Sequence, residues 1–267
     1  MYGFTFHRPE TIRQAVNLLS KDADAKLLAG GHTLLPTMKL RLANPPQLID
    51  LSRIEGLAGI ELSSRSLSIG AMTRHADVHS SAVVQQAVPV LAKLAGMIGD
   101  PAVRHMGTIG GSIANNDPTA DYPAACLGLG ATIITNKRGI KADEFFTGLF
   151  STALEPTEII TRVSFPIPKK AAYQKFRNQA SRYALVGVFV AKRGGDIRVV
   201  VTGAGGNGVF RVKAFEEALQ KRFSPKSLDD LAVAADGLNS DIHGSAEYRA
   251  HLIGVLARRA VAEAVGK

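Results

Sequence analysis

Two short glycine-rich runs of the same design, far apart in the chain, limit its fold more than any other feature. The first reads Ala-Gly-Gly-His-Thr at residues 29–33, and the second reads Gly-Thr-Ile-Gly-Gly-Ser at residues 107–112. Glycine has no Cβ, so backbone N–H groups can approach an anion closely, and the hydroxyl residue adds a donor. Two such loops predict two contacts with one diphosphate, and so a dinucleotide bound outside the usual strand–helix fingerprint.

Neither run matches the two better-known phosphate loops. A P-loop needs a lysine followed by Ser or Thr after its last glycine, and both runs lack it. A match to G-x-G-x-x-G occurs at residues 203–208, after an apolar strand-like stretch. Helix-like sequence follows, where a Rossmann fold needs a second strand that ends in an acidic residue. We therefore interpret residues 203–208 as a glycine-rich turn that leaves a strand.

A single cysteine, Cys126, limits the redox chemistry of this chain. It excludes an internal disulfide, and it excludes an iron–sulfur cluster held by this chain alone, because such clusters need several thiolates. The apolar neighbours of Cys126 predict a packed core thiol. Any iron–sulfur centre that works with this protein must therefore be held by a partner.

The charge balance favours an anionic cofactor or a partner subunit over nucleic acid. Lys and Arg outnumber Asp and Glu by 32 to 23, which gives a net charge of +9. The basic residues are spread through the chain, no basic run alternates with aromatic residues, and Trp is absent, so nucleic-acid binding is not expected. No apolar run reaches the length of a membrane span and residues 1–13 have no apolar signal core, so we expect a cytoplasmic protein.

The order of predicted elements indicates an α+β protein with two domains. The stretch at residues 167–172, where Pro166 and Pro168 end a predicted strand, predicts the boundary between them. The predicted helices span residues 9–19, 34–42, 78–98 with a kink near Pro89, and 246–265, and one more begins with Asp117 as its N-cap. The predicted strands span residues 25–29, 48–51, 131–135, 159–165, 173–177, 185–192 and 197–202, with a hairpin in residues 59–73 and a loop at residues 99–109.

Two pairs of side chains have the i, i+4 spacing that metal ligands often use on a helix. They are His75 with His79 and Asp117 with Asp121. No third ligand is evident for either pair, so the histidines favour a solvated helix start over a metal site. The two carboxylates favour a helix N-terminus, and one of them suits the hydroxyls of a nucleotide sugar.

Three stretches of the chain together resemble one family. They read Leu-Ala-Gly-Gly-His-Thr-Leu-Leu-Pro at residues 28–36, Arg-His-Met-Gly-Thr-Ile-Gly-Gly-Ser-Ile-Ala at residues 104–114, and Asp-Pro-Thr-Ala-Asp-Tyr-Pro at residues 117–123. The chain resembles the FAD-binding medium subunit of molybdenum hydroxylases, the group of the carbon monoxide dehydrogenase medium subunit and of the flavin domain of xanthine dehydrogenase. The resemblance covers nearly the whole chain.

The resemblance implies a particular architecture and cofactor. Residues 1–168 are expected to form a two-lobed FAD-binding domain of the vanillyl-alcohol oxidase type. Residues 169–267 are expected to form a smaller domain with a three-stranded antiparallel sheet and helices. FAD is expected to bind without a covalent bond and in an extended pose, with its diphosphate between the two glycine runs.

The same resemblance assigns roles to individual residues. Asp121 is expected to hydrogen-bond the sugar hydroxyls of FAD, and Ile160 to pack near the flavin. Lys175 and Tyr183 are expected beside the isoalloxazine ring, where a lysine stabilises negative charge on the reduced flavin; an exposed sheet face is the simpler alternative for both. The full set of expected cofactor-binding residues is Ala29, Gly30, Gly31, His32, Thr33, Leu34, Thr108, Ile109, Gly110, Gly111, Ser112, Asp121, Ile160, Lys175 and Tyr183.

The implied function is electron transfer within a larger enzyme. In this family a large subunit oxidises the substrate at a molybdenum–pterin centre, and a small subunit carries two [2Fe-2S] clusters that pass electrons to FAD. The flavin then delivers them to an outside acceptor, and the redox chemistry belongs to the cofactor. The expected assembly is a dimer of heterotrimers.

Two other functions stay open from the sequence. One is a stand-alone flavin oxidase or reductase of the vanillyl-alcohol oxidase type, in which a histidine placed like His32 bonds covalently to flavin. The other is a scaffold protein that keeps a vestigial fold. Substitution of Gly31 and Gly111 by bulky residues separates these functions, because a scaffold keeps its function without the glycine loops.

Overall fold

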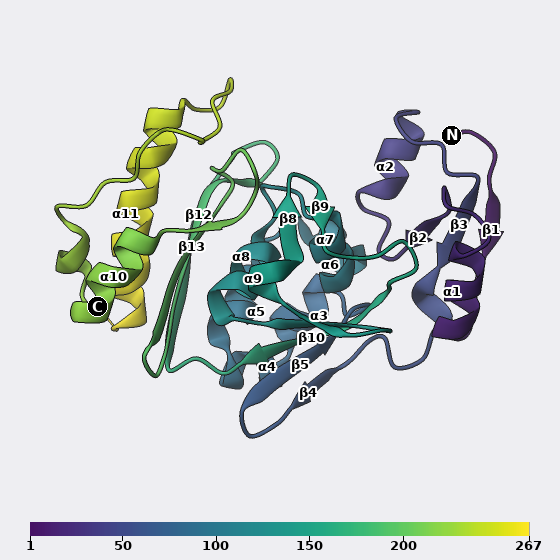
Figure 1. Cartoon of the computed structure of the whole chain (residues 1–267), viewed down its shortest axis with the longest axis horizontal. Coiled ribbons are helices and arrows are strands. Elements are labelled where there is room, and N and C mark those ends of the chain that lie inside the picture. Colours follow the sequence, from purple (N-terminus) through teal and green to yellow (C-terminus); the bar gives the residue numbers. More distant parts are fainter. Residues whose placement is uncertain (267) are drawn as a thin grey trace.

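The structure, a computed structural model, describes residues 1–266 as three regions arranged along the molecule (Figure 1). The N-terminal lobe, at the right of Figure 1, holds a small parallel sheet with strand order β1-β3-β2. Helix α1 (Ile12–Leu19) begins after Thr11, whose side chain accepts a hydrogen bond from the N–H of Gln14. The other elements are β1 (Thr5–His7), β2 (Lys26–Leu28), α2 (Leu34–Lys39), β3 (Gln47–Asp50) and a 3-10 turn, η1 (Leu51–Arg53).

The middle lobe is built on a five-stranded antiparallel sheet of order β4-β5-β10-β6-β7. The hairpin predicted within residues 59–73 is confirmed as the pair β4 and β5. Strand β10 lies between β5 and β6, with Val163 opposite Ile69 on one side and Ile133 on the other. The strands are β4 (Ile60–Leu62), β5 (Ser66–Gly70), β6 (Thr132–Thr135), β7 (Gly139–Lys141) and β10 (Ile160–Pro166).

The single kinked helix predicted over residues 78–98 is wrong, because three short helices occupy this stretch. They are α3 (His75–Ser80), α4 (Ala82–Ala87) and α5 (Pro89–Gly96). Ser81 is extended and caps α4, with its side chain accepting a hydrogen bond from the N–H of Val84. Val88 is also non-helical, because the ring of a following proline disfavours the helical conformation. The two breaks fold α3 back against α5.

Two further differences lie just before and after the second glycine run. Residues 99–109, predicted as a loop, contain helix α6 (Pro101–Met106), capped by Asp100. Asp117, the predicted N-cap, instead forms a turn in which its carboxylate accepts hydrogen bonds from the N–H and hydroxyl of Thr119. Ala120 takes the N-cap position. The remaining elements of this lobe are α7 (Ile109–Asn115), α8 (Asp121–Leu129), α9 (Ala142–Phe145), β8 (Phe146–Gly148) and β9 (Ser151–Thr152).

The C-terminal region contains a four-stranded antiparallel sheet rather than the three strands predicted. The three predicted strands are found as β11 (Lys170–Arg177), β12 (Ala184–Arg193) and β13 (Asp196–Thr202), and the fourth, β14 (Phe210–Arg211), pairs with β13. A strand of two residues has no alternating pattern to read. The helical elements are α10 (Lys213–Lys221), a 3-10 turn η2 (Pro225–Leu228) and α11 (Ala246–Ala264).

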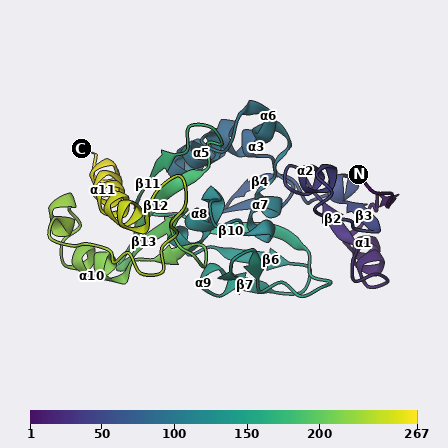
Figure 2. The ribbon, with the colours of Figure 1, turned by 90° about the horizontal axis from the view of Figure 1, so that it is seen from above.

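This sheet has helices on both faces (Figure 2). Helix α11 packs on β11 and β12, while α8 and α5 of the middle lobe pack on the other face. Residues 184–191 of β12 are therefore buried on both faces, which explains their unbroken apolar sequence. Phe189 faces the middle lobe so closely that a Cβ on Gly128 would lie 2.4 Å from its ring. The C-terminal sheet and the middle lobe therefore share one continuous core.

Candidate cofactor-binding site

The structure brings the two glycine runs into direct contact. A Cβ added to Gly30 would lie 2.1 Å from the carbonyl oxygen of Met106 and 2.7 Å from the Cα of Gly107. One added to Gly111 would lie 3.6 Å from the Cβ of Ala29. Only glycine at position 30 allows the two backbones to approach this closely, whereas the 3.6 Å at Gly111 is an ordinary van der Waals contact.

The first run presents free hydrogen-bond donors at the start of α2. Gly31 has a left-handed backbone with φ +71°, and its carbonyl accepts the N–H of Leu35 to open the helix. The N–H groups of Gly31, His32 and Thr33 donate to no other group in residues 1–266. The first N–H groups of a helix lack internal acceptors and attract anions. The run is therefore suited to bind a phosphate.

The second run has fewer free donors than the first. Ile109 donates its N–H to the carbonyl of Thr73 (3.1 Å), and Gly110 to that of Ala71 (2.8 Å), while the N–H of Thr108 donates to no group in residues 1–266. Gly111 donates to the Thr108 hydroxyl at 3.2 Å, so Thr108 is the N-cap of α7. What this run adds to the cavity is its shape, the free N–H of Thr108 and the Ser112 side chain.

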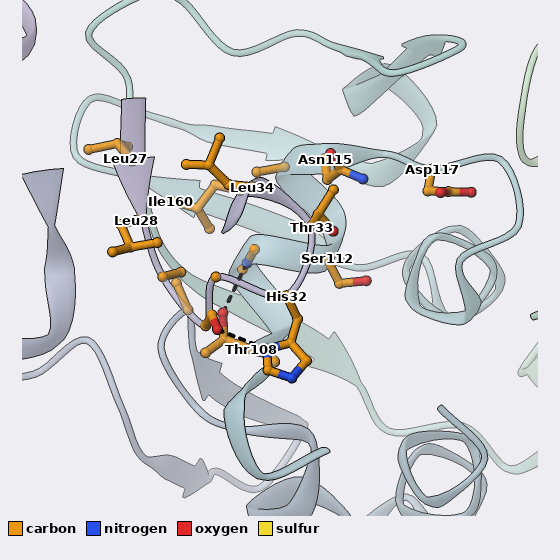
Figure 3. Close-up of a pocket in the computed structure, with 18 of the residues that line it drawn as sticks. Leu27, Leu28, His32, Thr33, Leu34, Thr108, Ser112, Asn115, Asp117 and Ile160 are labelled. Carbon is orange, nitrogen blue, oxygen red and sulfur yellow. Dashed lines mark hydrogen bonds between the residues drawn. The ribbon is translucent and has the colours of Figure 1, made fainter. Parts of the chain in front are cut away.

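The two runs line a cavity of about 610 Å³ between the N-terminal and middle lobes, a size typical of cofactor pockets. Figure 3 shows apolar side chains, Leu27, Leu28 and Ile160, at one end and polar Asn115 and Asp117 at the other. This division suits a ligand with an apolar ring system and a polar chain. The predicted residues that line the cavity are Ala29, Gly30, Gly31, His32, Thr33, Leu34, Thr108, Gly110, Gly111, Ser112, Ile160 and Tyr183.

Three predicted residues, Ile109, Asp121 and Lys175, do not line the cavity. Asp121 is buried, and its carboxylate accepts hydrogen bonds from the Tyr173 hydroxyl and from Lys175 Nζ, the latter at 2.8 Å. Each Asp121 oxygen thus already has one partner within the chain, and the sugar contact expected for Asp121 stays a prediction. The exposed face considered for Lys175 is also wrong, because its side chain is only 1% exposed.

Asp121 and Lys175 nevertheless lie close behind the cavity wall. Ala120, next to Asp121, lines the cavity, and Lys175 Nζ also donates to the carbonyl of Met97, whose neighbour Ile98 lines it. Burial raises the pKa of the Asp121 carboxyl, and the Lys175 ammonium opposes that rise. The pair joins α8 of the middle lobe to β11 of the C-terminal sheet.

Two of the lining residues that the sequence did not predict have unusual surroundings or conformation. His75, interpreted as part of a solvated helix start, is only 4% exposed and lines the cavity. Phe150 lines it too and has φ +50°, a strained conformation for a non-glycine residue. The i, i+4 spacing of His75 and His79 predicted an exposed helix surface. His75 is instead buried by α5 and α6, which pack on α3.

The structure also tests other predictions made from the sequence. Cys126 is fully buried, and burial raises the pKa of its thiol, in agreement with a packed core residue. Residues 203–208 form a turn after β13, as interpreted, with Gly203 at φ +84°. Within residues 1–266, no group of three or more His, Cys, Asp or Glu is placed to hold a metal ion. No helix in this range is long and apolar enough to cross a bilayer.

Comparison with known proteins gives the same result along the whole chain. A family model described as "FAD binding domain in molybdopterin dehydrogenase" matches residues 2–168, and one described as "CO dehydrogenase flavoprotein C-terminal domain" matches residues 171–264. The carbon monoxide dehydrogenase medium chain of Hydrogenophaga pseudoflava is 36% identical over 274 residues, which cover 97% of this chain and 96% of that protein. The nicotine 6-hydroxylase medium subunit of Paenarthrobacter nicotinovorans is 37% identical over 270 residues, covering 96% and 95%.

A solved structure extends the similarity to the fold. It is carbon monoxide dehydrogenase from Hydrogenophaga pseudoflava lacking the Mo-pyranopterin moiety of the molybdenum cofactor, and it matches with a TM-score of 0.89 at 36% identity over 99% of this chain and 98% of that chain. The fold and the two-loop cavity thus define an FAD-binding domain followed by a C-terminal flavoprotein domain. The chain belongs to the family of FAD-binding medium subunits of molybdenum hydroxylases, which are oxidoreductase subunits.

Proposed function

We propose that this chain is the electron-transfer subunit of a molybdenum hydroxylase and binds FAD without a covalent bond. It receives electrons from [2Fe-2S] clusters of a small partner subunit and passes them to an external acceptor. A large molybdopterin-binding subunit oxidises the substrate. The subunits form a dimer of heterotrimers in the cytoplasm. The single cysteine supports the need for a partner that carries the clusters.

One observation carries the proposal: the first glycine run, with free N–H groups, touches the second run, and both runs line the same cavity. A diphosphate fits this donor set, because backbone N–H groups at a helix start bind anions. The residues present therefore fit FAD. When bound, FAD supplies the exchange of two electrons, and the protein supplies binding and orientation.

Different residues of this chain have different roles in binding FAD. Gly31, His32 and Thr33 donate N–H groups to the diphosphate, and Ser112 adds a hydroxyl. Ile160 excludes water from the apolar end, and Tyr183, which is 49% exposed, covers the mouth. Asp121 and Lys175 act from behind the wall, where the buried lysine places positive charge near the ring. His32 lies within 3.2 Å of the Gly30 carbonyl through Nδ1, which supports a role in loop shape.

The finer architecture is part of the same proposal. We assign residues 1–168 to a two-lobed FAD-binding domain of the vanillyl-alcohol oxidase type and residues 169–267 to the C-terminal domain; residue 267 itself lies outside the described residues. The division of the first part into a parallel sheet and a separate five-stranded sheet, with the cavity between them, supports the two lobes.

An absorbance spectrum tests the cofactor assignment directly. The full chain, produced with its partner subunits, is incubated with FAD, desalted and measured before and after acid precipitation. The expected result is a flavin spectrum that moves to the supernatant. Flavin retained in the pellet contradicts non-covalent binding, and absence of flavin from the complex contradicts the function itself. Full turnover by a complex that lacks this chain would also overturn it.

A further inference from the structure

His75 occupies the floor of the cavity beneath the second glycine run. It is the first residue of α3, and its N–H donates to the carbonyl of Gly107 at 3.0 Å. Its ring fills the space where Gly107 would carry a side chain, since an added Cβ would lie 2.6 Å from His75 Nε2. Gly107 is therefore a glycine because the imidazole lies against it. The ring is held in place between the loop backbone and the core.

The imidazole has a polar atom that the described chain leaves without a partner. Nδ1 of His75 is buried and forms no hydrogen bond within residues 1–266, and the same is true of the Tyr122 hydroxyl. The two rings are in contact, with centroids 5.3 Å apart and planes tilted by 46°. Buried polar groups in native proteins almost always have partners. Both atoms are enclosed and do not open onto the cavity, whereas Nε2, the other ring nitrogen, is not enclosed and also forms no hydrogen bond within residues 1–266.

The surroundings of His75 keep the ring uncharged. Burial, together with the nearby side chains of His32 and Arg104, lowers its pKa to about 4. A neutral imidazole has one donor nitrogen and one acceptor nitrogen. Such a ring can hydrogen-bond a cofactor oxygen while bonding a second group on its other side, without adding a charge to the cavity.

We propose that His75 is a further cofactor-binding residue, which hydrogen-bonds FAD from beneath the second glycine run as a neutral imidazole. The inference rests on the proposed function. It adds a polar contact through Nε2 beside the second run, most of whose N–H groups are used within the chain by Ala71, Thr73 and Thr108.

Three substitutions distinguish the hydrogen bonds of the two ring nitrogens from the packing of the ring. His75→Phe keeps an aromatic ring without polar atoms, His75→Asn keeps a polar group near Nδ1, and His75→Gln keeps one near Nε2. His105→Gln is the matched control, because His105 is exposed, lies close to the same glycine run and does not line the cavity. The dissociation constant of FAD is measured in the stripped and reconstituted complex by quenching of flavin fluorescence. The unfolding temperature is measured without FAD.

The expected result is that His75→Phe weakens FAD binding by about tenfold while the unfolding temperature without FAD is unchanged or raised. One of His75→Asn and His75→Gln restores most of the affinity and identifies the bonding nitrogen. If His75→Phe binds FAD as the unaltered protein does, His75 serves structure only, through a water shared with Tyr122, and the inference is overturned. If His75→Phe does not fold, unchanged affinity in both amide variants overturns it equally. Loss of FAD from the unaltered protein and from His105→Gln would instead contradict the proposed function.

Discussion

The two glycine runs have the same design in the sequence but different properties in the structure. The first, residues 29–33, leaves its N–H groups free and uses a left-handed Gly31 to open α2. The second, residues 107–112, is buried or half-buried, and residues 71, 73 and 75 each form one backbone hydrogen bond with it. In the first run Gly31 serves conformation and Gly30 close approach, whereas in the second Gly107 and Gly110 serve close approach. A shared sequence pattern therefore indicates a shared site, but it does not indicate a shared role.

The largest expected effect comes from the point where the two runs touch. Gly30→Ala places a Cβ against the backbone of Met106, which no side-chain rotation can relieve. We expect a loss of about 3 kcal/mol or more in the free energy of unfolding, together with loss of FAD. Denaturant unfolding measures the first and flavin absorbance the second. Gly3→Ala is the control, because a Cβ at Gly3 has nothing within 4 Å. Equal stability of the two variants would mean that the runs do not touch.

Lowering the pH should reduce the free energy of unfolding through His75, which lies beneath the second run. The neutral ring has a pKa of about 4 in the folded chain, against 6.5 in the unfolded chain. Above pH 6.5 the ring is neutral in both states and pH has no effect through it. Below that value the unfolded chain binds a proton that the folded chain does not, so stability falls by about 3 kcal/mol as the pH approaches 4.

The measurement is the free energy of unfolding between pH 7 and pH 4 for the unaltered protein and for His75→Phe. The variant lacks the titrating ring, so its curve should be flatter over this range. Curves of the same slope would contradict burial of a neutral His75. His105→Gln, which alters an exposed ring, should keep the slope of the unaltered protein.

A left-handed glycine and a helical glycine can be compared directly at Gly31 and Gly111. Gly31→Ala forces a left-handed alanine at φ +71° and crowds the Leu35 side chain, so we expect a loss of about 1–2 kcal/mol and weaker FAD binding. Gly111→Ala lies in the first turn of α7, where alanine favours the helix, and its nearest neighbour is the Thr108 hydroxyl at 3.0 Å. It should change stability by less than about 1 kcal/mol. Reversal of this order in thermal unfolding would contradict the division of roles.

The smallest effect is expected at the two threonines. Thr108 caps α7 through its side chain, whereas Thr33, at the same position of α2, makes no capping hydrogen bond. Thr108→Ala should therefore cost about 1 kcal/mol of stability, and Thr33→Ala should leave stability unchanged. Thr33→Ala should instead weaken FAD binding, since the Thr33 side chain lines the cavity. Equal stability losses would show that the two helix starts are alike.

The sequence predicted the parts of this molecule that depend on local pattern. The long strands, the hairpin and the final helix follow from alternation and periodicity, and the paired runs predicted one shared site. The partner of Asp121 was not predictable in this way, because its carboxylate is used by Tyr173, 52 residues later in the chain. Burial of His75 likewise depends on helices that pack over it, and the use of the second run's N–H groups depends on Ala71 and Thr73. Such contacts are set by tertiary packing, which residue spacing does not encode.

The buried ion pair of Lys175 and Asp121 limits how the two domains of this fold can be exchanged between family members. Each charge is contributed by a different domain, and each is shielded from water, with the side chains only 1% and 4% exposed. A chimera that exchanges one domain and loses either partner leaves an uncompensated charge in the core, at a cost of about 3–5 kcal/mol. Positions 121, 173 and 175 must therefore be inherited together, and recombination at the domain boundary is constrained by a bond that crosses it.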